Sequence, residues 1–314
     1  PDGFLSGLED DVRFSRDRAA SRGEFLCAKL FAAYADLPFV DAAALIHFDE
    51  NGRIQRDRIA SSIRAMADRL PCAVIPGFYG SLPSGEIKTF SRGGSDITGA
   101  LVAAALNADL YENWTDVDGL MSADPALCPD AVCHPAVSYR QMRLLARAGA
   151  QVLHPYCLEP VCEAGVPTAL YNTFAPRKPG TYISDSVHAN ARCVCTLRGL
   201  TAAPLDALSD EARAVAGGLG AERLSSPNGR EWILLKDTPS LGRPVSLLTA
   251  FGLRSDKRKR AVHWTNPLAC LFQDEIGKFL VEPGRERDAL RALHRLVMEG
   301  ASKPAPTAAR IDQG

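Results

Sequence analysis

Hydrophobic residues along the first half of the chain follow two alternating periods, one helical and one strand-like. Ile59, Ile63, Met66 and Leu70 mark an amphipathic helix. The Ala-, Leu- and Val-rich run over residues 97–106 is a good helix former. Residues 110–114 then read as a short strand. Because helices and strands alternate, the pattern predicts an α/β fold with a mainly parallel sheet and helices on both faces. Further strands are predicted at 39–42 with an exit over 44–46, at 72–76 and at 168–172, and further helices at 25–34, 138–148 and 159–165.

The helix predicted over residues 25–34 carries apolar residues at helical spacing. Leu26, Leu30 and Ala33 recur on one face, so we expect that face to be buried. The preceding residues 1–20 are polar and charged without a clear period, and we expect them to lie on the surface.

The pattern changes after residue 186. We expect an α+β region over residues 187–300 and a disordered tail over 301–314, where prolines and small polar residues collect. The closing helix is predicted at 288–298, with Leu290, Leu293 and Val297 on one face. The other elements predicted here are strands at 193–197, 232–235, 245–251 and 278–281 and a helix at 205–216.

Composition narrows the class of protein. A chain of 314 residues is long enough for roughly two domains, and its 46% hydrophobic and 23% charged residues are ordinary for a globular protein. The net charge of −1 gives no reason to expect a nucleic-acid or membrane partner, and the basic run over 254–260 is expected to be a solvated loop or helix face. No apolar run approaches the roughly 20 residues of a membrane span, and no signal peptide opens the chain. Nine cysteines without CxxC pairs indicate reduced thiols in the cytoplasm and no metal site.

The candidate chemistry lies between residues 88 and 125. Residues 91–96, SRGGSD, form a glycine-rich turn before a predicted helix, whose start Ser95 or Asp96 is placed to cap. Free N–H groups and the positive end of the helix dipole suit a carboxylate or phosphate there, and Arg92 can hold a carboxylate with two parallel hydrogen bonds. The acidic loop over 115–119 follows a strand, at the sheet edge where ligands bind in α/β folds.

These residues also carry a family resemblance. The stretch TFSRGGSDITGALVAAALNADLYENWTDVDG resembles the central signature of aspartate kinases in the amino acid kinase superfamily. The segments GFYG, YENWTDV and NTFAPRKPGT are similar to the monofunctional bacterial branch. The resemblance implies an amino acid kinase domain over 1–186, followed by a degenerate ACT-like regulatory region over 187–300.

The resemblance also implies residue roles. Arg92 and Asp96 would act in catalysis, and Glu24 in SRGE would help bind the amino acid. Read without the family, Glu24 is simply an acidic residue in a first helical turn. GFYG implies a loop beside the transfer centre, although a glycine turn explains it equally well. The residues implied to bind substrate are Glu24, Arg92, Gly93, Gly94 and Ser95, and those implied to bind nucleotide are Thr115, Asp116, Met121, Gln151 and Val152.

The activity implied is phosphorylation of the L-aspartate side-chain carboxylate by ATP with Mg²⁺, the first step toward lysine, threonine and methionine. The family further implies a cytoplasmic homodimer through the ACT-like region, with lysine or threonine as a possible effector.

Some features depart from the family pattern. The chain starts at Pro1 and does not contain the KxGG-type phosphate loop; Met121, Ala126 and Gln151 replace residues common at those positions. These departures support a second hypothesis, a homologue that binds an amino acid as a regulatory subunit without turnover. A third keeps the fold with another acceptor, such as glutamate. His154 is expected to fix a loop before its proline rather than to transfer protons.

Overall fold

The computed structural model describes most of the chain between residues 14 and 299. Gln151, His154 and the tail after residue 299 lie outside the described residues, as do the first 13 residues. The chain divides into two compact units, one built from residues 1–114, 153–169 and 183–185 and the other from the remainder. The described ranges are 14–150, 152–153, 155–187, 191–211, 213–214, 222–225, 229–236, 243–251, 253–265, 267 and 269–299.

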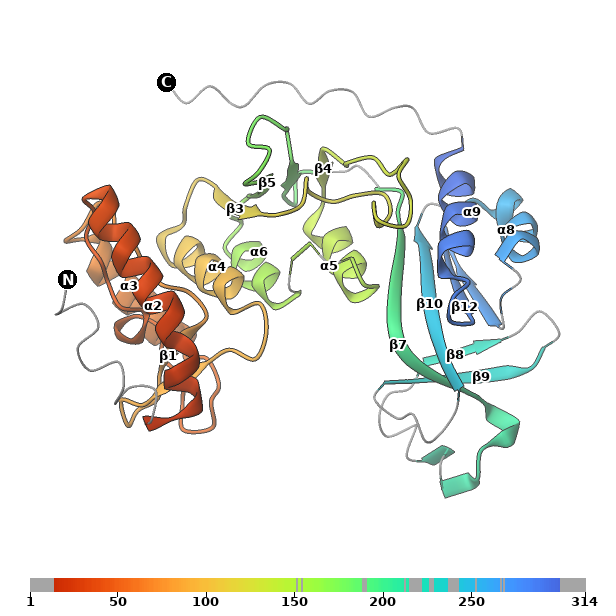
Figure 1. The fold of residues 1–314 in the computed structure, drawn as a ribbon, viewed down its shortest axis with the longest axis horizontal. Coiled ribbons are helices and arrows are strands. Elements are labelled where there is room, and N and C mark those ends of the chain that lie inside the picture. The colour runs from red at the N-terminus through yellow and green to blue at the C-terminus, as the bar shows by residue number, and fades with distance from the viewer. Residues whose placement is uncertain are drawn as a thin grey trace. The chain divides into compact units, whose positions relative to one another are not determined.

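The first unit is rich in helices (Figure 1). Its elements are α2 (Arg16–Ala35), η2 (Ala42–Ala44), α3 (Arg56–Ala67), β1 (Tyr79–Ser81), β2 (Ile87–Thr89), α4 (Gly94–Leu106), η3 (Pro155–Cys157) and α6 (Leu158–Glu163). α4 packs against α3 and α6, as its composition requires, because its small and aliphatic side chains are buried on most of its circumference. Ile59 and Ile63 of α3 are fully buried, which confirms the predicted amphipathic helix.

A four-stranded sheet contains β3 (Tyr111–Thr115), β4 (Ala136–Val137), β5 (Thr168–Asn172) and β6 (Thr181–Ile183) in the order β3-β5-β6-β4. The predicted strands at 110–114 and 168–172 are therefore confirmed. The helix α5 (Tyr139–Arg147) begins after Ser138, whose hydroxyl accepts a hydrogen bond from the Gln141 N–H, and it confirms the helix predicted at 138–148.

The predicted burial of α2 is wrong. Leu30 is 63% exposed and Ala33 is exposed, while the polar Ser21 and Arg22 are buried. Helical spacing was read correctly, but it cannot say which residues of the helix meet the rest of the fold.

The strands predicted at 39–42, with its exit over 44–46, and at 72–76 are largely absent. Asp41 accepts a hydrogen bond from the Ala43 N–H and starts the short helix η2, because a local Asx contact competes with strand pairing. What remains of the two strands is one parallel bridge between Phe39 and Val74. A second parallel bridge joins His47 to Ser81.

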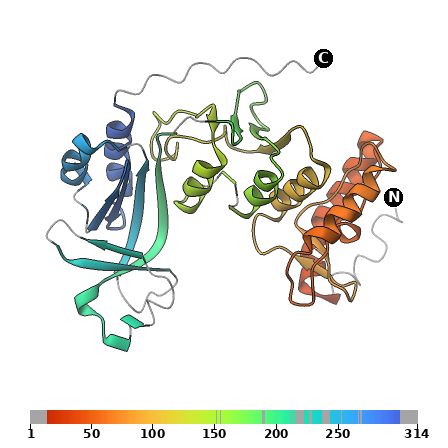
Figure 2. The same ribbon diagram turned by 180° about the vertical axis from the view of Figure 1, so that it is seen from behind.

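The second unit contains a closed antiparallel barrel over its described residues (Figure 1). The strands follow the order β10-β12-β11-β8-β9-β7, and β7 and β10 lie side by side in both views (Figure 1 and Figure 2). The elements are β7 (Val194–Pro204), η4 (Leu205–Ala207), β8 (Glu222–Ser225), β9 (Glu231–Lys236), β10 (Arg243–Phe251), η6 (Ser255–Lys257), α8 (Arg258–Thr265), β11 (Ala269–Gln273), β12 (Ile276–Val281) and α9 (Glu286–Met298).

The predicted strands and closing helix of this region are confirmed, and β8, β11 and α8 are additional. Leu290, Leu293 and Val297 of α9 are fully buried in one hydrophobic core with β10 and β12. The helix predicted at 205–216 begins instead as the short 3-10 helix η4, and in its described part only residues 210, 211, 213 and 214 are α-helical.

The basic run over 254–260 is not wholly solvated. The Lys257 side chain is 8% exposed, and its ammonium group donates hydrogen bonds to the carbonyls of Leu296 (2.8 Å) and Glu299 (2.7 Å). The lysine therefore satisfies carbonyls at the C-terminal end of α9 that no helical N–H can reach.

The described residues thus form a mixed α/β fold that includes parallel pairing, followed by an α+β region, as predicted. The domain limits at residues 186 and 300 stay a prediction. No helix in the described part of the chain is long and apolar enough to cross a membrane.

Candidate active site

Two glycine loops meet at the start of α4. Gly77 and Phe78 of the first loop lie against Gly94 and Ser95 of the second: a Cβ placed on Gly94 would stand 2.6 Å from the Phe78 Cβ, and one on Gly77 would stand 2.6 Å from the Ser95 Oγ. Side chains cannot approach that closely, so only glycine allows the contact. Phe78 also adopts φ +60, a strained value for a bulky residue that clusters at functional sites.

The start of α4 differs from the prediction. Gly93 is the N-cap residue, with φ 58, and no side chain caps the helix. The expected cap by Ser95 or Asp96 is therefore wrong, because α4 already begins at Gly94 and includes both residues. Left without a capping side chain, the helix N-terminus keeps N–H groups for an anionic ligand.

Glu24 reaches this junction from α2. Its Oε1 accepts a hydrogen bond from the Gly77 N–H at 3.4 Å. Nearby, Arg22 is 8% exposed and its guanidinium group stacks over the Phe25 ring at 4.4 Å from the ring centroid. The Tyr79 hydroxyl donates a hydrogen bond to Asp41 at 2.8 Å. Burial raises the pKa of Tyr79, so its hydroxyl stays a donor. These contacts hold the loop at Gly77 in position from the side of α2 and η2.

Asp96 is oriented by the sheet. Its carboxylate accepts a hydrogen bond from the buried Asn113 amide at 3.0 Å, and its backbone carbonyl accepts one from the Tyr111 hydroxyl at 3.2 Å. Arg92 and Ser95 are exposed beside it and open to a ligand. The structure thus brings Glu24, through Gly77, together with the Gly93–Asp96 turn, and Arg92 lies at the start of that turn.

The residues implied to bind nucleotide belong to the second unit. Thr115 ends β3, and its hydroxyl donates to the exposed Asp116 carboxylate at 3.2 Å. Met121 forms an antiparallel bridge with Cys133, and Val152 is half-buried. Gln151 and His154 fall outside the part of the chain that the structure describes, so their roles stay predictions.

Sequence reasoning missed the partners of this acidic loop. Asp118 accepts hydrogen bonds from the Asn172 amide (2.7 Å) and the Lys178 ammonium group (2.6 Å), both in the loop over residues 172–180, here named the closing loop. Those two hydrogen bonds, the one from Lys178 foremost, lower the pKa of the Asp118 carboxyl. The signal was present in the quoted motifs TDVDG and NTFAPRKPGT, but the sequence does not show that they touch.

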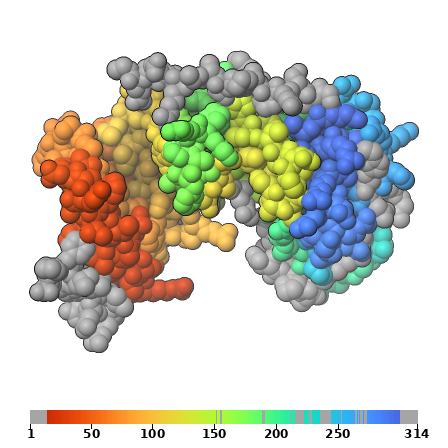
Figure 3. Space-filling view, turned by 45° about the horizontal axis from the view of Figure 1, so that its top comes forward, coloured from red at the N-terminus to blue at the C-terminus, as the bar shows by residue number. Residues whose placement is uncertain are grey.

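Behind the acidic loop, residues 122–131 dock on α9. The Ser122 hydroxyl lies 2.9 Å from His294 Nε2, and the Cys128 sulfur 3.4 Å from His294 Nδ1, all buried. Ala123 and Cys128 share the hydrophobic core of α9, and Figure 3 shows yellow surface of this segment against the blue of α9. The acidic loop is thus continuous with a segment anchored on α9 of the α+β region.

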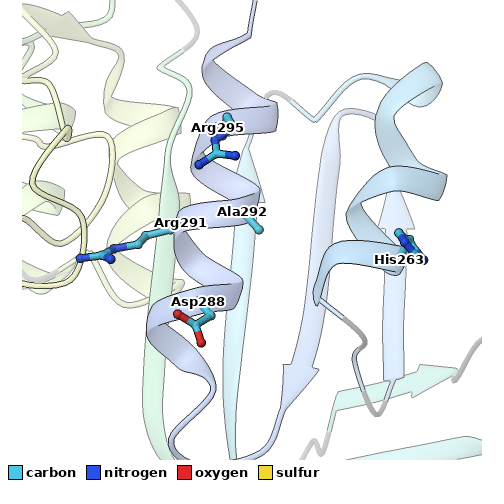
Figure 4. A pocket seen from close by; sticks show the side chains of 5 residues that line it. All are labelled: His263, Asp288, Arg291, Ala292 and Arg295. Atoms are coloured by element: carbon cyan, nitrogen blue, oxygen red, sulfur yellow. The ribbon is translucent and has the colours of Figure 1, made fainter.

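An open polar pocket of about 500 Å³ lies between α8 and α9. Figure 4 shows Arg291 reaching away from α8, and its Nε donates to the Leu127 carbonyl at 2.8 Å. This arginine therefore helps to hold the docked segment rather than to fill the pocket. The lining residues are His263, Asp288, Arg291, Ala292 and Arg295.

Comparison with known proteins gives the class. The model of the amino acid kinase family matches residues 5–172, and the chain belongs to that family. Within it, the relatives are aspartokinases: Aspartokinase 3 of Bacillus subtilis is 37% identical over 57% of this chain and 41% of the relative, and the aspartokinase of Rickettsia felis is 40% identical over 58% and 47%.

Solved structures agree. The aspartate kinase of Clostridium acetobutylicum is 28% identical with a TM-score of 0.78, covering 94% of this chain and 79% of that one. Aspartokinase III of Escherichia coli, solved with aspartate and ADP, has a TM-score of 0.74 and covers 95% of this chain and 80% of that one. At 20% sequence identity, this match shows that the two folds are alike. The chain spans less than half the length of the two curated relatives named above.

Proposed function

We propose that the protein is an aspartate kinase that transfers the γ-phosphoryl group of ATP to the side-chain carboxylate of L-aspartate. The observation that carries the proposal is the junction of the two glycine loops with Glu24. There, a carboxylate from α2, the exposed Arg92 and an uncapped helix N-terminus belong to one substructure. The aspartokinase relatives support the same assignment.

In this proposal each residue has a physical task. Arg92 holds a carboxylate of the amino acid with two charge-assisted hydrogen bonds, and Glu24 pairs with the α-ammonium group. The free N–H groups at the start of α4 face the charge on the transferring group. Asp96, fixed by Asn113, orients the turn that carries these groups.

The chemistry needs no strong base, because the acceptor is already ionised. An oxygen of the aspartate carboxylate forms a bond to the γ-phosphorus, and the bond from that phosphorus to the bridging oxygen breaks, so that ADP leaves with the electron pair. Positioning and charge neutralisation are then the main contributions of the protein.

Mg²⁺ is expected to enter with the nucleotide. The described residues include no group of three His, Cys, Asp or Glu side chains that could hold a metal ion. Mg²⁺ usually keeps waters and phosphate oxygens and needs only one or two carboxylates, so the absence of such a group from the described residues is compatible with its use.

Regulation and assembly belong to the proposal as well. Aspartokinase III of Escherichia coli has been solved with lysine and aspartate, and it shares this fold at a TM-score of 0.69 and 22% identity. We extend the likeness to an amino acid effector, lysine or threonine, to a homodimer through the α+β region and to a cytoplasmic location.

A trapping assay tests the reaction itself. The product is an acyl phosphate, which hydroxylamine converts to a hydroxamate that ferric ion colours. Incubating the complete gene product with Mg-ATP, aspartate and hydroxylamine should give aspartyl hydroxamate. If colour forms with glutamate in place of aspartate, the acceptor is wrong; if neither gives colour, the kinase assignment fails.

A further inference from the structure

The closing loop is fastened to the acidic loop at three points. The Thr173 N–H donates to the Thr115 carbonyl at 2.8 Å, and the two oxygens of Asp118 accept from Asn172 and Lys178. All of these residues belong to the same compact unit. The two loops therefore form one surface, and Thr115 and Asp116, which are implied to bind nucleotide, lie on it.

The closing loop presents two side chains that the proposed function has not used. Phe174 is 84% exposed, the second most exposed of the large hydrophobic side chains in the described residues. The Lys178 side chain is 56% exposed. Two successive turns shape the loop between these residues: the Ala175 N–H donates to the Asn172 carbonyl, and the Lys178 N–H donates to the Ala175 carbonyl. Figure 3 shows the green of this loop at the molecular surface.

The backbone at Phe174 is tied to the acidic loop through Asn172. Its N–H donates to the Asn172 side-chain oxygen at 2.9 Å, and the same Asn172 amide donates to Asp118. Phe174 therefore presents an aromatic face on the surface that also carries Thr115 and Asp116, and such a face can stack on a base. A purine base offers a flat π-face of the right kind.

Lys178 supplies the complementary charge. The loop beside it carries the carboxylates Asp116 and Asp118, which by themselves would repel a polyphosphate. An exposed ion pair contributes little to stability. The Lys178 ammonium group can therefore leave the Asp118 carboxylate and bind a phosphate oxygen with little loss of free energy. An ammonium group is a common phosphate ligand in proteins.

We propose that Phe174 and Lys178 form a nucleotide-binding surface on the closing loop, where Phe174 stacks on the purine base and Lys178 binds a phosphate group. The inference rests on the proposed function, because it adds Phe174 and Lys178 to the nucleotide site that the resemblance implies for Thr115 and Asp116.

Displacement of a fluorescent ADP analogue from the complete gene product tests the inference, with ADP and adenosine as competitors. Phe174→Ala should weaken both competitors about five- to hundredfold, because both contain the base. Lys178→Met should weaken ADP about tenfold or more and leave adenosine unchanged, and Lys178→Arg should restore most of the ADP affinity.

Matched controls are available elsewhere on the surface. Phe31→Ala removes a ring that is 57% exposed on α2, and Lys259→Met removes an exposed charge on α8; both should bind ADP like the wild type. Thermal melting shows whether each variant is folded, and Phe174→Leu replaces Phe174→Ala if the latter is not.

The possible outcomes distinguish a failure of the closing-loop inference from a failure of the proposed kinase function. Wild-type affinity for ADP in both closing-loop variants overturns this inference and leaves the proposed function standing. Equal loss of ADP and adenosine in Lys178→Met also overturns it, because the lysine would then act on the fold of the loop. A wild-type protein that binds no ADP contradicts the proposed function and this inference together.

Discussion

At the scale of single residues, the contact between the two glycine loops should tolerate no side chain. In Gly94→Ala the new Cβ would lie 2.6 Å from the Phe78 Cβ and 2.7 Å from its Cα, so the loops must separate. We expect a loss of about 1–3 kcal/mol in the free energy of unfolding, together with reduced turnover. Gly23→Ala is the control: no atom lies within 4 Å, and alanine is favoured in a helix by about 0.5–1 kcal/mol. Denaturant titration of both variants checks this, and a Gly94→Ala as stable as wild type would refute the contact.

Arg92 gives a second residue-scale prediction. Arg92→Ala should raise the KM for aspartate about 10- to 150-fold, since a hydrogen bond to a charged group contributes about 1.5–3 kcal/mol. Arg92→Lys keeps the charge but loses the fork, so its KM should fall between those of Arg92→Ala and wild type. Steady-state kinetics decides, and an unchanged KM in Arg92→Ala would remove Arg92 from the substrate site.

Residue types and motifs could be predicted from the sequence, but contacts between distant segments could not. The structure places Glu24 beside Gly77, which lies against the Gly93–Asp96 turn, but Glu24 is in the middle of α2 and not at the helix start that the sequence suggested; that these residues bind substrate stays a prediction. The ion pair of Asp118 with Lys178 depends on how β3 and β5 pair, and no local spacing encodes that pairing.

At the scale of elements, α9 depends on a buried lysine. Lys257→Met keeps most of the apolar stem but leaves the carbonyls of Leu296 and Glu299 without their donor, so the protein should lose about 1–3 kcal/mol of stability. Lys259→Met, at an exposed position of the neighbouring helix, should be neutral. Thermal melting of the two variants tests the difference, and equal melting temperatures would show that the cap does not contribute.

The α2 helix shows that the hydrophobic pattern of a single element does not predict which of its residues are buried. Its apolar residues repeat at helical spacing, yet Leu30, Phe31 and Tyr34 are exposed and the polar Ser21 and Arg22 are buried. Arg22 is stable inside because it stacks on Phe25 and donates hydrogen bonds to the Ser21 hydroxyl. Periodicity therefore predicted the helix, while tertiary partners decided which of its residues are buried.

At the scale of the whole molecule, buried histidines should make stability fall in mild acid. Burial lowers the pKa of His47, His134 and His294 below their ordinary value of 6.5. The unfolded chain therefore binds more protons, and the stability contributed by the neutral rings is present above pH 6.5 and is lost as the pH falls toward their folded-state pKa values. Paired carboxylates such as Asp118 lose their contribution only at lower pH.

The melting temperature should thus drop between pH 7.5 and 5.5, by about 2–4 °C for each 1 kcal/mol lost. His294→Gln should be less stable than wild type at pH 7.5, because Ser122 and Cys128 lose a partner, but its loss on acidification should be smaller. A variant with the same pH dependence as wild type would show that His294 does not titrate in this window.

The central claim is the activity, and one measurement tests it most directly. Release of ADP from Mg-ATP by the complete gene product is followed with aspartate, with glutamate and with neither. The account predicts release that depends on aspartate and not on glutamate. Aspartate binding without ADP release would contradict it, and would identify the protein as an amino-acid-binding subunit that has kept the fold and lost the transfer.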